Sequence, residues 1–439
     1  MNLRVLIYMN PLIVDKVSKK FLWEKDSGFL YTKQLIHNLP LEWRITILVP
    51  KGFDSKFFGE QQYRVIECIE YDYSTSIHQN RYHFNRNILA KALPYGTDID
   101  VVLNMQPEVT ENIKVFFQNQ RREKPIIINY FHWIDCKESR KFARYLGGFI
   151  WRQVEGARSA DLNLFHTPYA WDLFNESANE ANLPVDKIKF GYFFPQPTIF
   201  GTKPIILPNK KIILFNHRLN NTTGWKEVVK SCKRLKEEVQ DFILWITDDQ
   251  NLKEMEYLKQ YSWIKIQRVT FESYGYLIKN CHFSVCNTKE YATWNMAVLD
   301  SKANGCTPLV PATDLFNTMF GGKIPTDYTG LLYPSMRMLL NNTKQENDKW
   351  LIPLDIEQDN SIVPFIESEI YDKVKYKTMK KYDEVVKYIE SNNGSLKKDF
   401  VNHFWSFHAN SNFQLIRWKL LTNNFIDVIN NKETKYLAK

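Results

Sequence analysis

The sequence predicts an α/β protein of two tandem domains, each built on a parallel sheet covered by helices on both faces. Three observations lead to this prediction. The 439 residues exceed what one compact core normally holds. Short apolar runs alternate with longer amphipathic stretches almost from end to end, which is typical of strands buried on both faces and joined by helices. A segment rich in proline and lacking periodicity interrupts this alternation near the middle of the chain.

In the first half, the expected strands are short runs rich in β-branched residues, separated by stretches with a helical pattern. They cover residues 3–9, 43–50, 63–71, 100–106, 125–133, 161–167 and 187–194. The first domain is therefore assigned to residues 1–200. The proline-rich segment 193–210 is interpreted as the linker between the domains.

The same alternation restarts after the linker. The expected strands of the second half cover residues 211–218, 242–248, 263–269, 282–288 and 307–313. We assign the second domain to residues 201–396. From residue 397 the pattern is helical and dense in aromatic side chains, so residues 397–439 are expected to form a helical segment that packs back across the domains.

Composition favours a cytoplasmic protein and argues against a membrane-spanning one. Charged and amide residues interrupt every apolar stretch before it reaches membrane-spanning length. The N-terminus lacks the apolar core and cleavage site of a signal peptide. The six cysteines are scattered, several within apolar runs, so reduced buried thiols are expected, and neither a disulfide framework nor a metal site.

The first chemical motif follows the first expected strand of the second half. Arg218 stands where this strand ends, and Lys226 stands in the first turn of the next helix, for which Thr222 or Thr223 is the expected N-cap. A cation in a first turn opposes the helix dipole, which indicates a bound anion. Arginine with lysine is a common clamp for a diphosphate, and the carboxyl ends of parallel strands are where such sheets bind ligands. Ordinary surface charge is the alternative reading.

The second motif lies between residues 286 and 310. A strand ends, a loop follows, and a helix is expected from about Asn295 to Asn304, where Gly305 stops it. The free backbone N–H groups of Asn295, Met296 and Ala297 would form a phosphate site. Asp300 lies one turn further along, within reach of ribose hydroxyls. A solvated helix acid is the alternative reading.

These two motifs resemble the donor domain of the GT-B glycosyltransferases, in the large retaining family that uses nucleotide sugars. Arg218 and Lys226 match that family's pair after the first strand of its C-terminal domain. The segment Asn295–Pro308 resembles its Glu-x7-Glu helix ending in Gly-Thr-Pro, with Asp300 at the ribose-binding position. Ala292 stands where the first Glu is expected. Either Glu290 fills that role through a loop two residues longer, or the contact with the donor sugar is absent.

The resemblance implies two Rossmann-like domains with a cleft between them, a C-terminal helix crossing back, and a UDP-sugar as donor substrate with no cofactor or metal required. It implies catalytic roles for Arg218 and Lys226. In the first half, His132 follows an expected strand where the family commonly places a histidine near the transferred sugar, and Asp135 stands three residues later. The resemblance implies catalytic roles for both. A structural histidine is the alternative for His132. We interpret His166 as structural, with Thr167 as a helix N-cap.

The run Asn221–Lys226 is similar to the Thr-Thr-x-Trp-Lys run of the phage α-glucosyltransferases that modify hydroxymethylcytosine in DNA. That subgroup also has a His-Asp pair and a basic N-terminal domain. Between residues 114 and 158 the net charge is strongly positive, and a solvated helix face is the alternative reading. The basic residues expected to contact duplex DNA are Arg121, Arg122, Lys124, Arg140, Lys141, Arg144 and Arg152.

The sequence thus predicts a monomeric hexosyl- or pentosyltransferase that moves a sugar from UDP, with retention, to a hydroxyl acceptor. The resemblance to the phage subgroup implies a hydroxymethylated base in phage DNA as that acceptor. Two alternatives stay open: a transferase for a surface polysaccharide or lipid-linked glycan, and a non-catalytic GT-B protein that binds nucleotide.

Overall fold

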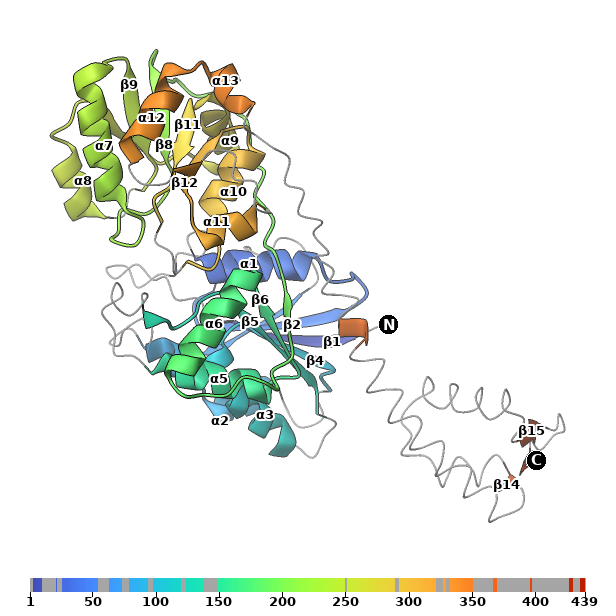
Figure 1. Cartoon of the computed structure of the whole chain (residues 1–439). Helices are drawn as coiled ribbons and strands as arrows, with labels where there is room; N and C mark the ends of the chain where they lie inside the picture. Colours follow the sequence, from blue (N-terminus) through green and yellow to red (C-terminus); the bar gives the residue numbers. More distant parts are fainter. Residues whose placement is uncertain are drawn as a thin grey trace. The chain divides into compact units, whose positions relative to one another are not determined.

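The computed structural model describes residues 3–9, 21, 26–53, 63–72, 79–93, 98–119, 124–137, 148–248, 251–288, 292–320, 327–328, 332–349, 366–368, 395–396, 426–428 and 435–438. The chain divides into two compact units, Met1–Ser361 and Ile362–Lys439. The first unit holds two parallel sheets with helices packed on them (Figure 1). Each strand that the sequence predicts is present within its predicted range.

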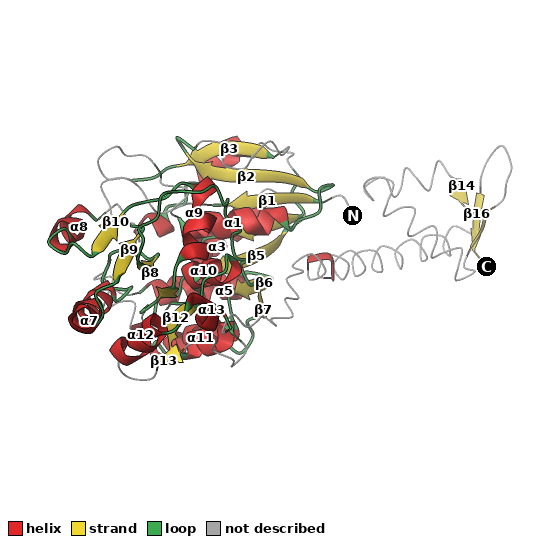
Figure 2. Cartoon of the chain, turned by 90° about the horizontal axis from the view of Figure 1, so that it is seen from above, coloured by secondary structure: helices red, strands yellow, loops and turns green. Residues whose placement is uncertain are grey.

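The first sheet has the strand order β3-β2-β1-β4-β5-β6-β7, and all its neighbouring strands are parallel. Figure 2 shows β3, β2 and β1 side by side at one end of this sheet. The order reverses between β1 and β4, which is the switch point of a doubly wound sheet. Its strands are β1 (Arg4–Tyr8), β2 (Arg44–Pro50), β3 (Arg64–Ile69), β4 (Val101–Asn104), β5 (Ile126–Phe131), β6 (Leu162–Phe165) and β7 (Phe190–Tyr192).

Helices pack on the apolar side chains of the first sheet. Leu6, Val102 and Ile127 belong to a buried cluster with α2 and α3. Phe131 and Phe165 belong to another with α5 and α6, on the same face of the sheet, because Ile127 and Phe131 are four residues apart on β5. The helical elements of this half are α1 (Ser27–His37), η3 (Gln79–Tyr82), α2 (Arg86–Ala92), η4 (Pro107–Val109), α3 (Thr110–Asn119), α5 (Phe149–Ser159) and α6 (Pro168–Glu180). Thr167 caps α6 as predicted, accepting a hydrogen bond from the amide of Ala170.

The second sheet repeats this arrangement with the order β10-β9-β8-β11-β12-β13, also parallel. Its strands are β8 (Lys211–Phe215), β9 (Phe242–Ile246), β10 (Ile264–Ile266), β11 (Phe283–Val285), β12 (Pro308–Pro311) and β13 (Asp327–Tyr328). The sequence did not predict β13, which has only two residues. Residues 193–210, between the two sheets in the chain, contain neither helix nor strand.

Alternating side chains of β8 separate two layers of helices. Ile213 and Phe215 pack with α7, α8 and α12, whereas Ile212 and Leu214 pack with α9 on the opposite face. Figure 1 shows α7 and α12 on one side of this sheet and α9 and α10 on the other. The helices are α7 (Trp225–Glu238), α8 (Leu252–Leu258), α9 (Phe271–Asn280), α10 (Met296–Ala303), α11 (Asp314–Met319), α12 (Leu332–Asn341) and α13 (Lys344–Asp348).

The second unit requires a correction. Its described strands, β14 (Ser395–Leu396), β15 (Ile426–Val428) and β16 (Lys435–Ala438), form an antiparallel sheet in the order β14-β16-β15. Residues 426–428 and 435–438 are therefore strands, not parts of the predicted helical tail. Both segments carry β-branched, aromatic or leucine side chains that suit a pleated surface. The helical prediction was extended over them from the aromatic-rich helical pattern that precedes them in the sequence. The remaining residues of 397–439 lie outside the described part, and their packing across the domains stays a prediction.

Candidate functional site

The candidate donor site is built on the loops that follow β8 and β11. These strands are neighbours at the point where the order of the second sheet reverses, which opens a crevice beyond their carboxyl ends in doubly wound folds. Asn216 follows β8 and donates hydrogen bonds to the carbonyl of Ala297 (3.0 Å) and the hydroxyl of Ser301 (3.1 Å). The end of β8 is thereby tied to α10, which carries the second predicted motif.

The structure places Arg218 and Lys226 as the sequence predicts. Arg218 is exposed in the loop after β8, and Lys226 is exposed in the first turn of α7, with Nζ 5.6 Å from the ring centroid of Trp225. The predicted N-cap is wrong. Gly224 occupies that position with φ +62°, because the hydroxyl of Thr223 turns back and donates to the carbonyl of Arg218 at 2.6 Å.

Gly224 also lets the β8–α7 loop approach the end of β11. A Cβ atom at this position would lie 2.2 Å from Nδ2 of Asn287 and 2.6 Å from its carbonyl oxygen. Both the close approach and the left-handed φ angle therefore require glycine. The start of α7, with Lys226, consequently lies directly beside the residues that follow β11.

The helix α10 begins and ends as predicted. Asn295 is its N-cap, with Oδ1 accepting from the amide of Val298 (3.2 Å) and Nδ2 donating to the hydroxyl of Thr288 (3.0 Å). The Asn295 side chain is thus occupied in capping, which leaves the amides of Met296 and Ala297 at the helix start as donors for an anion. Gly305, with φ +81°, follows the end of the helix.

Asp300 is half-buried on α10, and the linker holds it in place. Its Oδ1 accepts a hydrogen bond of 2.7 Å from the amide of Thr198, while no described residue donates to its Oδ2. Burial raises the pKa of Asp300 to about 7, against the hydrogen bond from Thr198, which lowers it. The carboxyl group can therefore gain or lose a proton near neutral pH, and its Oδ2 can accept a hydrogen bond from a hydroxyl group of a ligand.

Tyr31, on α1 of the first half, is buried. Burial raises the pKa of its phenol, the Asp300 carboxylate adds to this rise, and the Arg218 guanidinium opposes it. The two hydrogen bonds of Asn216 hold the end of β8, which Arg218 follows, beside the helix that carries Asp300.

His132 follows β5 and is half-buried. Its carbonyl accepts a hydrogen bond of 3.3 Å from the hydroxyl of Thr293, which also contacts Nδ1 of His166 at 3.0 Å. Burial lowers the pKa of His132 well below its ordinary value, and the nearby Arg81 guanidinium adds to that effect. A Cβ atom on Gly28, in the first turn of α1, would lie 3.3 Å from Nε2 of His132, so the small residue leaves room for the ring.

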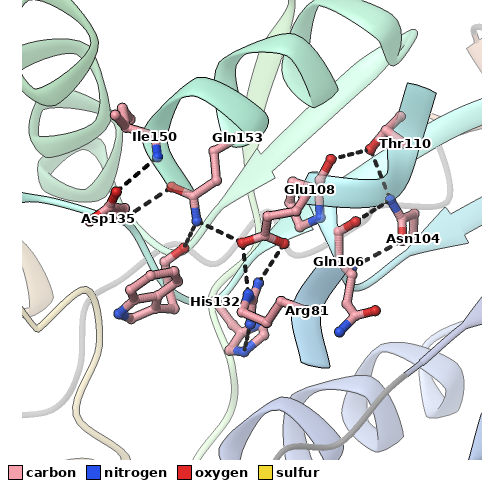
Figure 3. A network of polar contacts seen from close by, with 11 residues as sticks. Arg81, Asn104, Gln106, Glu108, Thr110, His132, Asp135, Ile150 and Gln153 are labelled. Carbon is pink, nitrogen blue, oxygen red and sulfur yellow. Dashed lines mark hydrogen bonds and ion pairs between the residues drawn. The ribbon is translucent and has the colours of Figure 1, made fainter. Parts of the chain in front are cut away.

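Asp135, for which the resemblance implies a catalytic role beside His132, is held in a hydrogen-bonded network. It is fully buried, and its Oδ2 accepts from the amide of Ile150 at 2.9 Å, in the first turn of α5. Its own amide donates to Oε1 of Gln153, whose Nε2 donates to Glu108 (Figure 3). This geometry favours a role in holding α5 beside the site.

Two polar groups of the first half were not found from the sequence. One is the buried pair of Arg81 and Glu108. The other is a row of asparagines, Asn104, Asn129 and Asn163, which occupy paired positions on β4, β5 and β6. The sequence did contain a sign of this row, because each of these three strands is apolar except for its asparagine.

The predicted basic surface is only partly described. Lys124 and Arg152 are both exposed. The remaining members, Arg121, Arg122, Arg140, Lys141 and Arg144, lie outside the described residues, as does Glu290.

The sequence Asp98-Ile-Asp100 has the spacing of a metal-binding Asp-x-Asp motif, but both carboxylates pair with Arg4, Asp98 at 2.7 Å and Asp100 at 2.8 Å, at the amino ends of β1 and β4. Within the described ranges, no group of three acidic, histidine or cysteine side chains is arranged to hold a metal ion. In that same part of the chain, no helix has the length and apolarity needed to cross a membrane.

Comparisons with known proteins identify the fold. No protein-family model and no curated protein matches the sequence. Among solved structures, the chain is similar to sucrose-phosphate synthase from Thermosynechococcus elongatus (TM-score 0.58, 12% identity, covering 86% of this chain and 100% of that one). It is similar to HepE from Anabaena in complex with UDP and glucose (TM-score 0.56, 12% identity, covering 85% of this chain and 100% of that one). It is also similar to α,α-trehalose 6-phosphate synthase from Burkholderia multivorans (TM-score 0.55, 10% identity, covering 80% of this chain and 93% of that one).

These similarities extend over most of the chain and agree with the two parallel, doubly wound sheets. The fold is therefore the α/β GT-B fold that the sequence predicts. At these identities the comparisons establish the fold alone, and the reaction has to be argued from the residues.

Proposed function

We propose that this protein is a glycosyltransferase that uses a UDP-sugar donor. The observation that carries the proposal is that Asn216, two residues before Arg218 at the carboxyl end of β8, is hydrogen-bonded to α10, the helix that carries Asp300. Arginine and helix amides suit a diphosphate, and a carboxylate suits a ribose diol. HepE from Anabaena, which shares the fold, has been solved with UDP-glucose, which supports the choice of donor.

In the proposed reaction the acceptor hydroxyl attacks the anomeric carbon from the face that the diphosphate leaves, so the configuration is retained. The bond from the anomeric carbon to the phosphate oxygen breaks, and that oxygen takes the acceptor proton. Arg218 and Lys226 stabilise the charge that develops on the diphosphate. Asp300 binds the ribose, and His132 contacts the transferred sugar.

The test is release of UDP from a panel of UDP-sugars, comparing Lys226→Ala with wild type. Loss of one charge contact to the leaving group should lower kcat on the order of 100-fold. Lys230→Ala is the matched control, because Lys230 is exposed one turn further along α7 and should not affect the rate. Activity of Lys226→Ala close to wild type would refute the assignment of Lys226.

For the acceptor, we propose a hydroxymethylated base in duplex DNA. The motif Asn221–Lys226 and the exposed Lys124 and Arg152 support this choice. Mass spectrometry of nucleosides from modified DNA, incubated with the protein and mixed UDP-sugars, tests for a glycosylated base. The affinity for the duplex should fall steeply as the salt concentration rises. In a plot of the logarithm of the binding constant against the logarithm of the salt concentration, each phosphate contact should add about −0.9 to the slope.

The outcomes separate this proposal from its alternatives. Transfer to a glycan or lipid-linked acceptor without measurable DNA binding at low salt would favour a surface-glycan transferase. No UDP release with any donor, together with retained UDP binding, would favour a non-catalytic nucleotide-binding protein, which the absence of the first Glu at Ala292 also suggests.

A further inference from the structure

A buried ion pair lies directly beside His132. Arg81, on η3, donates from Nε to Oε1 of Glu108 at 2.7 Å and from Nη2 to Oε2 at 2.9 Å, and both side chains are at most 1% exposed (Figure 3). Gln153 on α5 gives Glu108 a third hydrogen bond of 3.0 Å. The guanidinium also lies 5.2 Å from the ring centroid of Trp133. Two-pronged pairing fixes the guanidinium plane.

The third nitrogen of the guanidinium points to His132. Nη1 of Arg81 lies 3.4 Å from Nε2 of the imidazole. A guanidinium can only donate hydrogen bonds, so Nε2 must be the acceptor and carries no proton. Because burial and the positive charge of Arg81 keep the pKa of His132 low, the ring is neutral. Its single proton is therefore on Nδ1.

Nδ1 of His132 is buried, and no described residue accepts a hydrogen bond from it. An unsatisfied buried donor costs about 1–3 kcal/mol unless a water molecule or a ligand completes it. His132 as a whole residue is half-buried, and the Nε2–Cε1 edge of its ring faces Gly28 at the start of α1. An oxygen of a bound molecule would satisfy this donor.

We propose that Arg81 is a positioning residue that holds His132 in the Nδ1–H tautomer, so that Nδ1 donates a hydrogen bond to a hydroxyl oxygen of the bound ligand. Glu108 and Gln153 act through Arg81 by fixing its orientation. The identity of the ligand as the transferred sugar rests on the proposed function. The tautomer does not depend on it, because it follows from the contact between Arg81 and His132.

The tautomer can be measured without activity, by ¹⁵N NMR of the imidazole nitrogens in the full chain, with the signals assigned by loss in His132→Asn. Wild type should show a neutral ring protonated at Nδ1. The double variant Arg81→Leu/Glu108→Leu removes the guanidinium without leaving a buried unpaired carboxylate, and replacing a buried pair in this way is often tolerated. In it the Nδ1–H tautomer should lose its dominance.

A surface pair provides the matched control. Arg158 and Glu155 form an ion pair on α5 with both side chains substantially exposed, so Arg158→Leu/Glu155→Leu should leave the His132 signals unchanged. A ring protonated at Nε2 in wild type would overturn the proposal. So would an Nδ1–H tautomer that persists in the Arg81→Leu/Glu108→Leu variant.

A second measurement tests whether Nδ1 meets the ligand. The amide nitrogen of Asn reaches roughly the position of Nδ1, and that of Gln reaches roughly the position of Nε2. In the UDP-release assay His132→Asn should retain about 10-fold more activity than His132→Gln, a difference of about 1.4 kcal/mol. Equal activities, or the reverse order, would contradict the contact. If no donor is turned over at all, the proposed function fails while the NMR result still decides the role of Arg81.

Discussion

The backbone amide of Thr198 donates a hydrogen bond of 2.7 Å to Oδ1 of Asp300. The same segment makes two further contacts with α10, since the amide of Phe200 donates to Oδ1 of Asn304 and Nδ2 of Asn304 donates to the carbonyl of Thr198. The linker thus occupies one carboxylate oxygen and leaves the other for a ligand. The proposed ribose acceptor is fixed in position before the donor binds.

Binding of a UDP-sugar should release protons near pH 7. The pKa of Asp300 is about 7 in the free protein, so about half of the molecules carry a proton there at neutral pH. Ribose hydroxyls that donate to the carboxylate favour its ionised form and lower its pKa. Calorimetry in buffers of different ionisation enthalpy should detect a release of up to about half a proton per UDP-sugar. The release should be absent in Asp300→Asn, and its persistence there would assign the proton to another group.

The same carboxyl should make stability depend on pH. Its pKa is raised in the folded protein, so the folded state binds more protons than the unfolded chain between about pH 4 and 7, and the free energy of unfolding falls as pH rises through this window. The full shift would correspond to about 4 kcal/mol, and less is expected because Asp300 is only half-buried. Urea midpoints measured from pH 4 to 8 should fall more steeply for wild type than for Asp300→Asn. Equal slopes would show that the carboxyl does not carry the effect.

The hydroxyl of Thr293 should be needed for stability because it connects three segments. It donates to the carbonyl of His132 and lies 3.0 Å from Nδ1 of His166, which is fully buried. Thr293→Val keeps the shape but leaves a buried imidazole nitrogen without a partner, at a cost of about 1–3 kcal/mol. Thr293→Ser retains the hydroxyl and should unfold close to wild type in urea. A Val variant as stable as the Ser variant would show that these contacts contribute nothing.

The donor half was largely predictable because its chemistry lies next to its secondary-structure signals. Arg218 follows a β-branched run, and Asn295 and Gly305 bound a helix with their own capping chemistry. A local pattern of that kind can be read without knowing the fold. The N-cap of α7 was missed because the hydroxyl of Thr223 bonds within its own loop, where it competes with capping.

The network of the first half was not predictable for the opposite reason. Arg81 and Glu108 are 27 residues apart, and Arg81 reaches His132 over 51. A charged residue in a polar stretch appears as a surface group until the topology places it against its partner. Only the tertiary fold creates the pair and, with it, the tautomer of His132.

Gly156→Ala should destabilise the protein although alanine usually favours a helix. A Cβ atom at this position in α5 would lie 1.9 Å from the carbonyl oxygen of Pro107, so the backbone of η4 would have to move. Overpacking of this kind costs about 1–3 kcal/mol, whereas an open helical site would gain up to about 1 kcal/mol. The urea midpoint should therefore fall. Arg152→Ala, exposed on the same helix, should change it little, and a midpoint for Gly156→Ala at or above wild type would refute the close approach of α5 and η4.

Replacing Asn129 with aspartate should destabilise the protein more at neutral pH than replacing it with leucine. Its Oδ1 accepts from Asn104 at 3.0 Å and from the hydroxyl of Thr110 at 2.7 Å, and its Nδ2 donates to Asn163 and to the carbonyl of Gly156, both at 3.0 Å. Asn129→Leu removes these bonds and leaves their buried partner groups unpaired, which should cost about 2–4 kcal/mol. Asn129→Asp loses the donors and also buries a carboxyl group, whose pKa should rise because desolvation disfavours the charged form.

The two variants therefore differ in their dependence on pH. Because the pKa of the carboxyl that Asn129→Asp introduces would be raised in the folded state, this variant should lose stability as pH rises from about 4 to 8, while the Leu variant should show no such additional loss. Asn179→Asp, exposed on α6, is the control for adding a negative charge and should lie close to wild type throughout. Parallel pH profiles for Asn129→Asp and Asn129→Leu would mean that water reaches the asparagine row, and that it does not form the dry polar layer connecting β4, β5 and β6.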